Sequence, residues 1–200
     1  FFSGYDCDSL AFEKISGFVR YFLPIFKKFP DVDIELRTKS IQMDPLFSME
    51  PISNCIVAFS LMPTEIAKKI DHKAPSIEKR INTISELASM GWKIGLRFDP
   101  LIHGENWKNL YINLFDNIFK NIDKKIIHSI TFGPLRFPKA MYKKIISMNP
   151  RSKLLSDSLA LRGNKISYSN DIELEMQSFC IELLKKYSPE TLFFSCKGNF

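Results

Sequence analysis

Three strand-like segments, each with a polar residue near its end, constrain the fold of this chain most. They cover residues 34–40, 55–61 and 93–100. Lys39, Ser60 and Asp99 stand near their carboxyl ends, and an amphipathic helix is predicted at 76–90, between the second and third segments. In parallel α/β folds the carboxyl ends of the strands carry the chemistry, so this pattern predicts a functional site along one edge of a parallel sheet.

The remaining segments continue the alternation of strands and helices. Helical spacing of apolar residues predicts helices at 10–29, 65–70, 107–122, 139–148 and 171–187, and apolar runs predict further strands at 1–3, 126–132 and 192–195. Pro24 is expected to kink or interrupt the first helix. Residues 153–168 read as an excursion with a hairpin turn at 162–165. Repeated strand–helix units favour one α/β domain over residues 1–200, a parallel sheet that closes or partly closes a barrel.

Composition and charge narrow the function classes. The chain has 28 basic and 22 acidic residues, a formal net charge of +6. Such a surface is either a solvated lysine-rich face or a groove for phosphates. No run approaches the roughly 20 apolar residues that span a bilayer. The four cysteines are scattered without a C-x-x-C pair or a predicted metal cluster, which favours a cytoplasmic protein with no membrane partner.

Several short segments occur in an order that is typical of a known family. They are DSLA at 8–11, IELRTK at 34–39, IVAFSL at 56–61, PSIEKR at 75–80, GWKIG at 91–95, DPLIH at 99–103, GENW at 104–107 and GPLRFP at 133–138. This series, from about Tyr5 to Phe194, resembles the spore photoproduct lyase family of radical S-adenosylmethionine proteins. The resemblance implies a partial (β/α)6 TIM-like barrel. It also implies reductive cleavage of S-adenosylmethionine to a 5′-deoxyadenosyl radical that acts on a UV photoproduct in DNA.

Cofactors and partners follow from the same resemblance. S-adenosylmethionine is one expected cofactor, and a [4Fe-4S] cluster held by a C-x-x-x-C-x-x-C loop is the other. The chain contains no such motif and begins at Phe1, in what reads as a strand end, so we expect the cluster ligands upstream of residue 1. DNA is the expected substrate, and a flavodoxin or ferredoxin is the expected electron donor. The protein is expected to be a cytoplasmic monomer.

The resemblance also assigns roles to residues at the strand ends. Lys39 matches a lysine that meets the methionine carboxylate, and Ser60 matches a serine that hydrogen-bonds the cofactor. From the residues alone, a solvated lysine and a capping hydroxyl are the alternatives. Tyr5 stands where the lyases have a hydrogen-donating cysteine, and Cys7 stands where they have a serine. Tyr5 and Cys7 are therefore the predicted catalytic residues, with packing at the barrel mouth as the alternative for Tyr5.

Three further residues are predicted to bind substrate. Arg136 follows a strand and can meet a phosphate or a cofactor carboxylate, although it could equally pair with a helix acid. Arg162 and Tyr168 lie in the excursion that corresponds in place to a hairpin that contacts DNA in the family. An exposed polar hairpin without a ligand is the alternative.

Two other functions stay open at the level of sequence. The first is a non-catalytic nucleic-acid-binding barrel that has lost the iron–sulfur cluster, which the residues encoded upstream of Phe1 would decide. The second is an unrelated barrel hydrolase that uses Asp99 and His103. It is less favoured, because no nucleophile–base pair or metal-ligand cluster accompanies these two residues.

Overall fold

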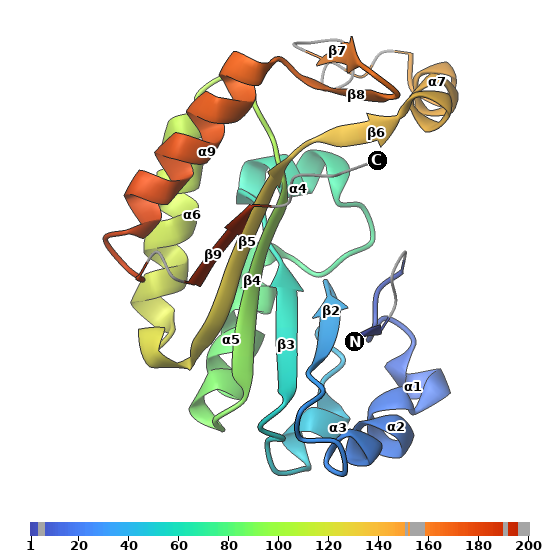
Figure 1. Cartoon of the computed structure of the whole chain (residues 1–200), viewed down its shortest axis with the longest axis vertical. Helices are drawn as coiled ribbons and strands as arrows, with labels where there is room; N and C mark the ends of the chain where they lie inside the picture. Colours follow the sequence, from blue (N-terminus) through green and yellow to red (C-terminus); the bar gives the residue numbers. More distant parts are fainter. Residues whose placement is uncertain (4–6, 151, 153–158, 190–191, 196–200) are drawn as a thin grey trace.

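A computed structural model of the chain describes residues 1–3, 7–150, 152, 159–189 and 192–195. Its centre is a six-stranded parallel sheet in the order β1-β2-β3-β4-β5-β9 (Figure 1). The strands are β1 (Phe2–Ser3), β2 (Ile34–Thr38), β3 (Cys55–Ser60), β4 (Lys93–Leu101), β5 (Ile127–Pro134) and β9 (Phe193–Ser195). The curved sheet stays open between β1 and β9 within the described residues, which confirms the prediction of a partial TIM-like barrel.

The helices connect successive strands, as expected for parallel pairing. They are α1 (Glu13–Ser16), α2 (Phe18–Phe26), α3 (Asp44–Phe47), α4 (Thr64–Ile70), α5 (Ile77–Ser89), α6 (Trp107–Asn121), α7 (Lys139–Met148) and α9 (Asn170–Leu184), with a short 3-10 turn η1 (Lys124–Ile126). Figure 1 shows α5, α6 and α9 gathered on one side of the sheet. Among the described residues, no helix has the length and apolar character that a membrane span needs.

Strand register explains why one face of the sheet is apolar and the other polar. Leu36 pairs with Val57, and Val57 pairs with Ile94, so these apolar side chains share the face that forms the buried core. One residue later, Arg37 pairs with Ala58, and Ala58 pairs with Gly95. The second face therefore carries small and charged residues, and it lines the inside of the open barrel.

A buried ion pair crosses this inner face. Arg97 on β4 donates from Nη2 to Oε2 of Glu35 on β2 at 2.7 Å, reaching across β3, and it also donates to Ser129 on β5. The space it needs comes from Ala58 and Gly95: a Cβ on Gly95 would lie 2.6 Å from Nη2 of Arg97. Burial by itself would raise the pKa of Glu35, but the bonds and charge of Arg97 outweigh this and lower it.

A second, three-stranded sheet stands above the barrel edge. It has the order β6-β8-β7, with β6 (Arg136–Pro138), β7 (Leu159–Arg162) and β8 (Lys165–Tyr168). The predicted hairpin at 162–165 is confirmed, and Gly163 takes the left-handed φ of +62° that the turn needs. The segment 136–138, at the end of the GPLRFP motif, pairs antiparallel with β8 as an edge strand.

The predicted helix at 10–29 is two helices, and the position of its break was wrong. The chain bends at Gly17, which has a φ of +60° and joins α1 to α2, whereas Pro24 lies inside α2. The buried Glu13 carboxylate accepts the N–H of Val19 at 3.1 Å and supplies a partner for the first turn of α2. A glycine next to a capping carboxylate therefore decided the break.

Candidate functional site

The carboxyl ends of β2 and β3 bring two predicted cofactor-binding residues to one edge. Thr38 pairs with Phe59 across the two parallel strands, so Lys39 and Ser60 each follow a paired residue at neighbouring strand ends. Both residues are half-buried, and 40% of the Lys39 side chain is exposed. The adjacency expected from the strand pattern is therefore present in the fold.

Lys39 is not a simple solvated lysine. Its Nζ donates to Oδ1 of Asp71 at 2.6 Å, and Oδ2 of the same carboxylate accepts from Nη2 of Arg80 at 2.5 Å. Asp71 directly follows α4, and Arg80 lies in the first turn of α5 with its side chain fully buried. Burial by itself would raise the pKa of Asp71, but hydrogen bonds from Lys39 and Arg80 outweigh this and lower it.

Arg80 also holds the end of β3. Its Nη1 donates to the backbone oxygen of Ser60 at 2.9 Å, and its Nε donates to the backbone oxygen of Pro75 at 3.0 Å. One guanidinium thus joins a strand end, the connection before α5 and, through Asp71, Lys39. The rigid fork of donors on arginine is suited to three fixed acceptors of this kind.

The loop that carries Cys7 is anchored beside Lys39. The Asp8 carboxylate accepts from Thr38 Oγ1 and from the backbone N–H of Lys39, each at 2.6 Å, and from the N–H of Leu10 at 2.9 Å. Cys7, the residue before Asp8, is exposed. Tyr5, the other predicted catalytic residue, lies outside the described residues.

Arg136 and Asp99 form a bidentate pair at the end of β4. Nη1 of Arg136 donates to Oδ1 at 2.8 Å, and Nη2 donates to Oδ2 at 3.1 Å. Two residues that the sequence suggested separately are therefore partners, and the acid that Arg136 meets comes from a strand rather than a helix. The pair links the barrel edge to β6, the first strand of the small sheet.

The hairpin residues differ in exposure. Arg162 is partly exposed, and its Nη1 lies 2.7 Å from Oε1 of Glu173 on α9 and donates to the backbone oxygen of Tyr168. Tyr168 is buried, and its hydroxyl accepts the backbone N–H of His103 at 3.0 Å. Burial raises the pKa of Tyr168 to about 12. The Tyr168 ring therefore does not lie on the surface of the hairpin, contrary to what a ring that stacks on a base requires.

The described cysteines do not fit an iron–sulfur cluster. Cys55 and Cys180 are buried in the apolar core, and burial raises the pKa of each thiol to about 12. A cluster needs three thiolates that converge, and within the described part of the chain no three His, Cys, Asp or Glu side chains could hold a metal. These two cysteines are therefore part of the hydrophobic core.

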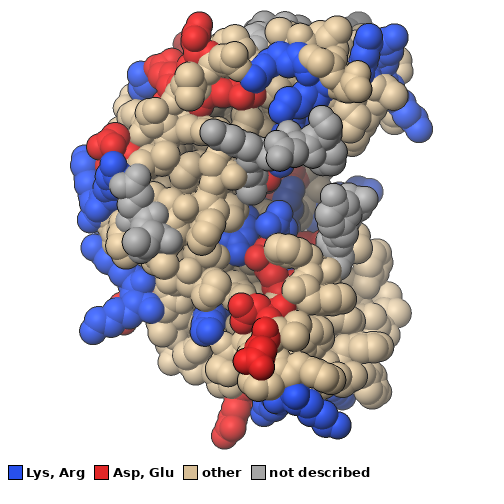
Figure 2. All heavy atoms as spheres, viewed as in Figure 1, with Lys and Arg blue, Asp and Glu red and all other residues tan. Residues whose placement is uncertain are grey.

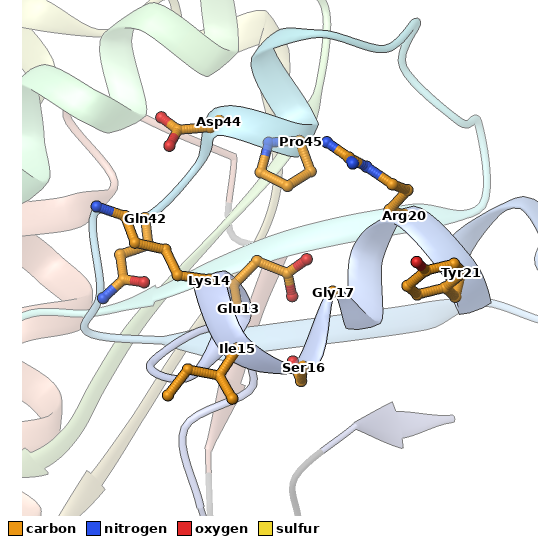
Figure 3. A pocket seen from close by; sticks show the side chains of 10 residues that line it. All are labelled: Glu13, Lys14, Ile15, Ser16, Gly17, Arg20, Tyr21, Gln42, Asp44 and Pro45. Atoms are coloured by element: carbon orange, nitrogen blue, oxygen red, sulfur yellow. The ribbon is translucent and has the colours of Figure 1, made fainter.

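A cavity of about 300 Å³ lies away from this edge, between α1, α2 and the start of α3 (Figure 3). Charged side chains of both signs line it, among them Glu13, Lys14, Arg20 and Asp44. None of the predicted site residues contributes to its wall. The cavity is therefore separate from the candidate site.

The surface view places basic side chains where the molecule is hollowed. Figure 2 shows a hollow on the right, between the part that carries the small sheet and the lower part, with Lys and Arg side chains inside it and Asp and Glu side chains close to them. Arg97, Arg80 and Arg136 each hold a carboxylate partner, so an anionic ligand would have to compete with these acids.

Sequence reasoning missed Asp71 and Arg80 as parts of the site. The signal for Arg80 was present: it interrupts the apolar face of α5 formed by Ile77, Ile81 and Ile84, and a charged residue on a core-facing stripe needs a buried partner. The signal for Asp71 was weak, because an Asp-His-Lys connector is also an ordinary loop.

The comparisons with known proteins all give spore photoproduct lyases. The family model for spore photoproduct lyase matches residues 1–192. A spore photoproduct lyase of Clostridium acetobutylicum is 24% identical over 187 residues, which are 90% of this chain and 55% of that protein.

Solved structures share the fold. A spore photoproduct lyase variant with bound AdoMet and dinucleoside spore photoproduct has a TM-score of 0.71 at 17% identity, covering 92% of this chain and 57% of that one. A spore photoproduct lyase complexed with the dinucleoside spore photoproduct has a TM-score of 0.67 at 18% identity, covering 82% of this chain and 50% of that one. The chain thus spans about half the length of these relatives.

Proposed function

The chain belongs to the spore photoproduct lyase family, and we propose that it forms the S-adenosylmethionine-binding barrel of a radical lyase that repairs a UV photoproduct in DNA. The observation that carries the proposal is the adjacency of Lys39 and Ser60 at neighbouring strand ends, beside the anchored Cys7 loop. The same residues match the cofactor-binding positions of the family by resemblance. Relatives of the same fold have been solved with AdoMet and with the dinucleoside photoproduct.

In this proposal the Lys39 ammonium binds the methionine carboxylate of S-adenosylmethionine. An ammonium is a compact point charge with three N–H donors, and Asp71 uses one of them. The Ser60 hydroxyl adds a hydrogen bond from the next strand. Reductive cleavage of the bound cofactor would release the 5′-deoxyadenosyl radical, with Cys7 and Tyr5 along its route to the substrate.

The described residues supply binding and positioning rather than the electron for cleavage. An iron–sulfur cluster supplies that electron in the family, and the cysteines within the described residues, the buried Cys55 and Cys180 and the exposed Cys7, do not fit one. The proposal therefore requires cluster ligands other than these thiols, and a flavodoxin or ferredoxin as electron donor.

Substrate binding is proposed for the hollow in Figure 2 and for the small sheet. Arg136 and Arg162 each hold a carboxylate partner, so a phosphate would compete with Asp99 and Glu173 for the two guanidinium groups. The buried Tyr168 would act through His103, whose backbone N–H it accepts, rather than by contact with a base. A cytoplasmic monomer remains the expected form.

The direct test is cofactor turnover by the protein as encoded. The protein is purified without oxygen, reconstituted with iron and sulfide, and incubated with dithionite, S-adenosylmethionine and the dinucleoside spore photoproduct. We expect 5′-deoxyadenosine and repaired dinucleotide, and loss of both in Lys39→Met. Glu182→Gln, which removes an exposed carboxylate from α9, is the control and should match the wild type. Binding of the dinucleoside without any 5′-deoxyadenosine would contradict the proposal.

That contradicting outcome is the signature of a second candidate function. A nucleic-acid-binding barrel without cluster chemistry is favoured by one observation, the misfit between the described cysteines and a cluster. Such a protein would bind irradiated DNA with unchanged affinity when S-adenosylmethionine is added. Titrating DNA with and without S-adenosylmethionine therefore separates the two functions.

A further inference from the structure

We propose that Asp71 and Arg80 are positioning residues that hold Lys39 and Ser60 in place for the carboxylate of S-adenosylmethionine. This inference rests on the proposed function and deepens it, because it names the residues that support the two predicted cofactor contacts. Neither residue was assigned a role by the sequence. Their role follows from the contacts that join β2, β3, α4 and α5 at one edge of the sheet.

The first step of the argument is how the Asp71 carboxylate is shared. One oxygen accepts from Nζ of Lys39 at 2.6 Å and the other from Nη2 of Arg80 at 2.5 Å. The Asp71 and Arg80 side chains are 8% and 0% exposed, whereas the Lys39 side chain is 40% exposed. The buried end of this chain of contacts is therefore fixed, and its exposed end is an ammonium with donors left for a ligand.

The second step is that Arg80 fixes both strand ends together. Its Nη1 donates to the backbone oxygen of Ser60, and its Nη2 holds Asp71, which holds Lys39. The relative position of the two predicted cofactor contacts thus depends on one buried guanidinium. A lysine in its place would keep the charge but lose the fork that serves three acceptors.

The third step distinguishes this network from an ordinary structural ion pair. Asp8 holds the backbone N–H of Lys39, so the main chain at this position is already fixed without Asp71. Asp71 contacts the end of the Lys39 side chain instead. Its bond therefore orients the ammonium, which is the part of Lys39 that would meet a carboxylate.

The test compares two ligands that differ in the carboxylate. S-adenosylmethionine carries the amino-carboxylate, and 5′-methylthioadenosine lacks it. Calorimetric titration of the encoded protein, kept without oxygen, should show that Asp71→Asn and Arg80→Lys weaken S-adenosylmethionine binding about tenfold or more. The same variants should leave the affinity for 5′-methylthioadenosine within about twofold of the wild type.

A double variant supplies a readout that a merely structural role would not move. In a Lys39→Met background, Asp71→Asn should weaken S-adenosylmethionine binding no further, because the ammonium that Asp71 orients is gone. Glu175→Gln, which breaks the exposed pair with Lys108 on the far helices, should change neither affinity. Asp71→Asn keeps the shape of the side chain but leaves the buried Arg80 charge uncompensated, so circular dichroism and the retained 5′-methylthioadenosine affinity confirm that each variant is folded.

The outcomes distinguish a failure of the positioning role from a failure of the proposed function. Equal weakening of both ligands, or no change in the S-adenosylmethionine affinity of Asp71→Asn, would overturn the positioning role while the proposed function stands. A wild-type protein that binds neither ligand would overturn the proposed function and this inference with it.

Discussion

At the scale of single residues, small side chains make room for a buried charge pair. Arg97 reaches Glu35 across β3 because the intervening positions are Ala58 and Gly95. The alternation of side chains along a strand places both charges on the same face, and a glycine inside a strand often marks the close approach of other atoms. The need for a glycine at 95 therefore arises from a side chain two residues further along the same strand.

Gly95→Ala should destabilise the protein by about 1–3 kcal/mol, because the added Cβ collides with Arg97 Nη2 and with Ala58 Cβ. Urea denaturation at neutral pH measures the free energy of unfolding. Gly104→Ala is the matched control: a Cβ there meets nothing within 4 Å, so its effect should stay within about 0.5 kcal/mol. Equal stability of the two variants would show that Arg97 moves aside without cost.

Glu35→Gln should be destabilising by about 3–5 kcal/mol at neutral pH, because it leaves the buried Arg97 charge uncompensated. The pKa of Glu35 is lowered in the folded state, so its stabilising contribution is present above the ordinary value of 4.5 and is lost as the pH falls through the folded pKa. The stability gap between wild type and Glu35→Gln should therefore narrow below pH 4.5.

Urea denaturation at a series of acid pH values checks this dependence. Arg97→Met should lose the same part of the acid sensitivity, because Arg97 is the main group that lowers the pKa of Glu35. If the difference in unfolding free energy between wild type and Glu35→Gln stays constant down to pH 3, the expected coupling between Glu35 protonation and stability is contradicted.

At the scale of elements, side chains between helices and strands set where each element begins and ends. Gly17 and Glu13 divide one predicted helix into α1 and α2. Ser76 accepts the N–H of Lys79 and marks the start of α5, as the sequence indicated. Local signals of this kind are legible in the sequence when the partner is three residues away, and they are not when it lies in another element.

Asn54 is such a long-range tie. It is buried, and its Nδ2 donates to the backbone oxygens of Phe26, Phe29 and Val32 at 2.8–2.9 Å, which holds the connection from α2 to β2 against the start of β3. Asn54→Ala should lower the free energy of unfolding by about 1–3 kcal/mol, because three partly buried carbonyls lose their donor. Chemical denaturation provides the measurement.

Two related variants sharpen this experiment. Asn54→Asp should be the more destabilising change, since a carboxylate would place negative oxygen against three carbonyl oxygens. Asn109→Ala, which removes an exposed contact with Asn106, should have little effect. An Asn54→Asp protein as stable as the wild type would mean that the three carbonyls find other donors.

At the scale of the whole molecule, basic side chains lie in a hollow, next to acidic ones (Figure 2). If the proposed DNA substrate binds there, its affinity should fall steeply with salt, because each neutralised phosphate releases counterions. Arg162→Gln and Lys165→Gln on the small sheet should each remove one phosphate contact. Each should therefore reduce the slope of log affinity against log salt concentration by about 1. Fluorescence anisotropy with irradiated DNA at several salt concentrations measures the slope.

Lys28→Gln is the charge-matched control for that measurement. Lys28 is exposed just after α2, at the end of the molecule away from the small sheet (Figure 1), so its loss lowers the net charge equally without touching the hollow. The same drop in slope for all three variants would indicate a general charge effect and no specific hairpin contact.

The sequence by itself determined the order of strands and helices, the parallel sheet and the edge at which Lys39 and Ser60 stand. These follow from hydrophobic periodicity and from the rule that parallel strands end together, both of which are local in the chain. The family resemblance assigned roles to those two residues, and it placed the catalytic prediction partly on Tyr5, outside the described residues.

Tertiary structure alone decided which charged residues are partners. Asp71 joins Lys39 to Arg80, Asp99 pairs with Arg136, and Glu35 pairs with Arg97 across an intervening strand, at sequence separations of 9 to 62 residues. It also decided that Tyr168 is buried and that 136–138 is a strand. These pairings depend on how distant segments pack. A buried charge needs an opposite charge as partner, and only the fold decides which one lies within reach.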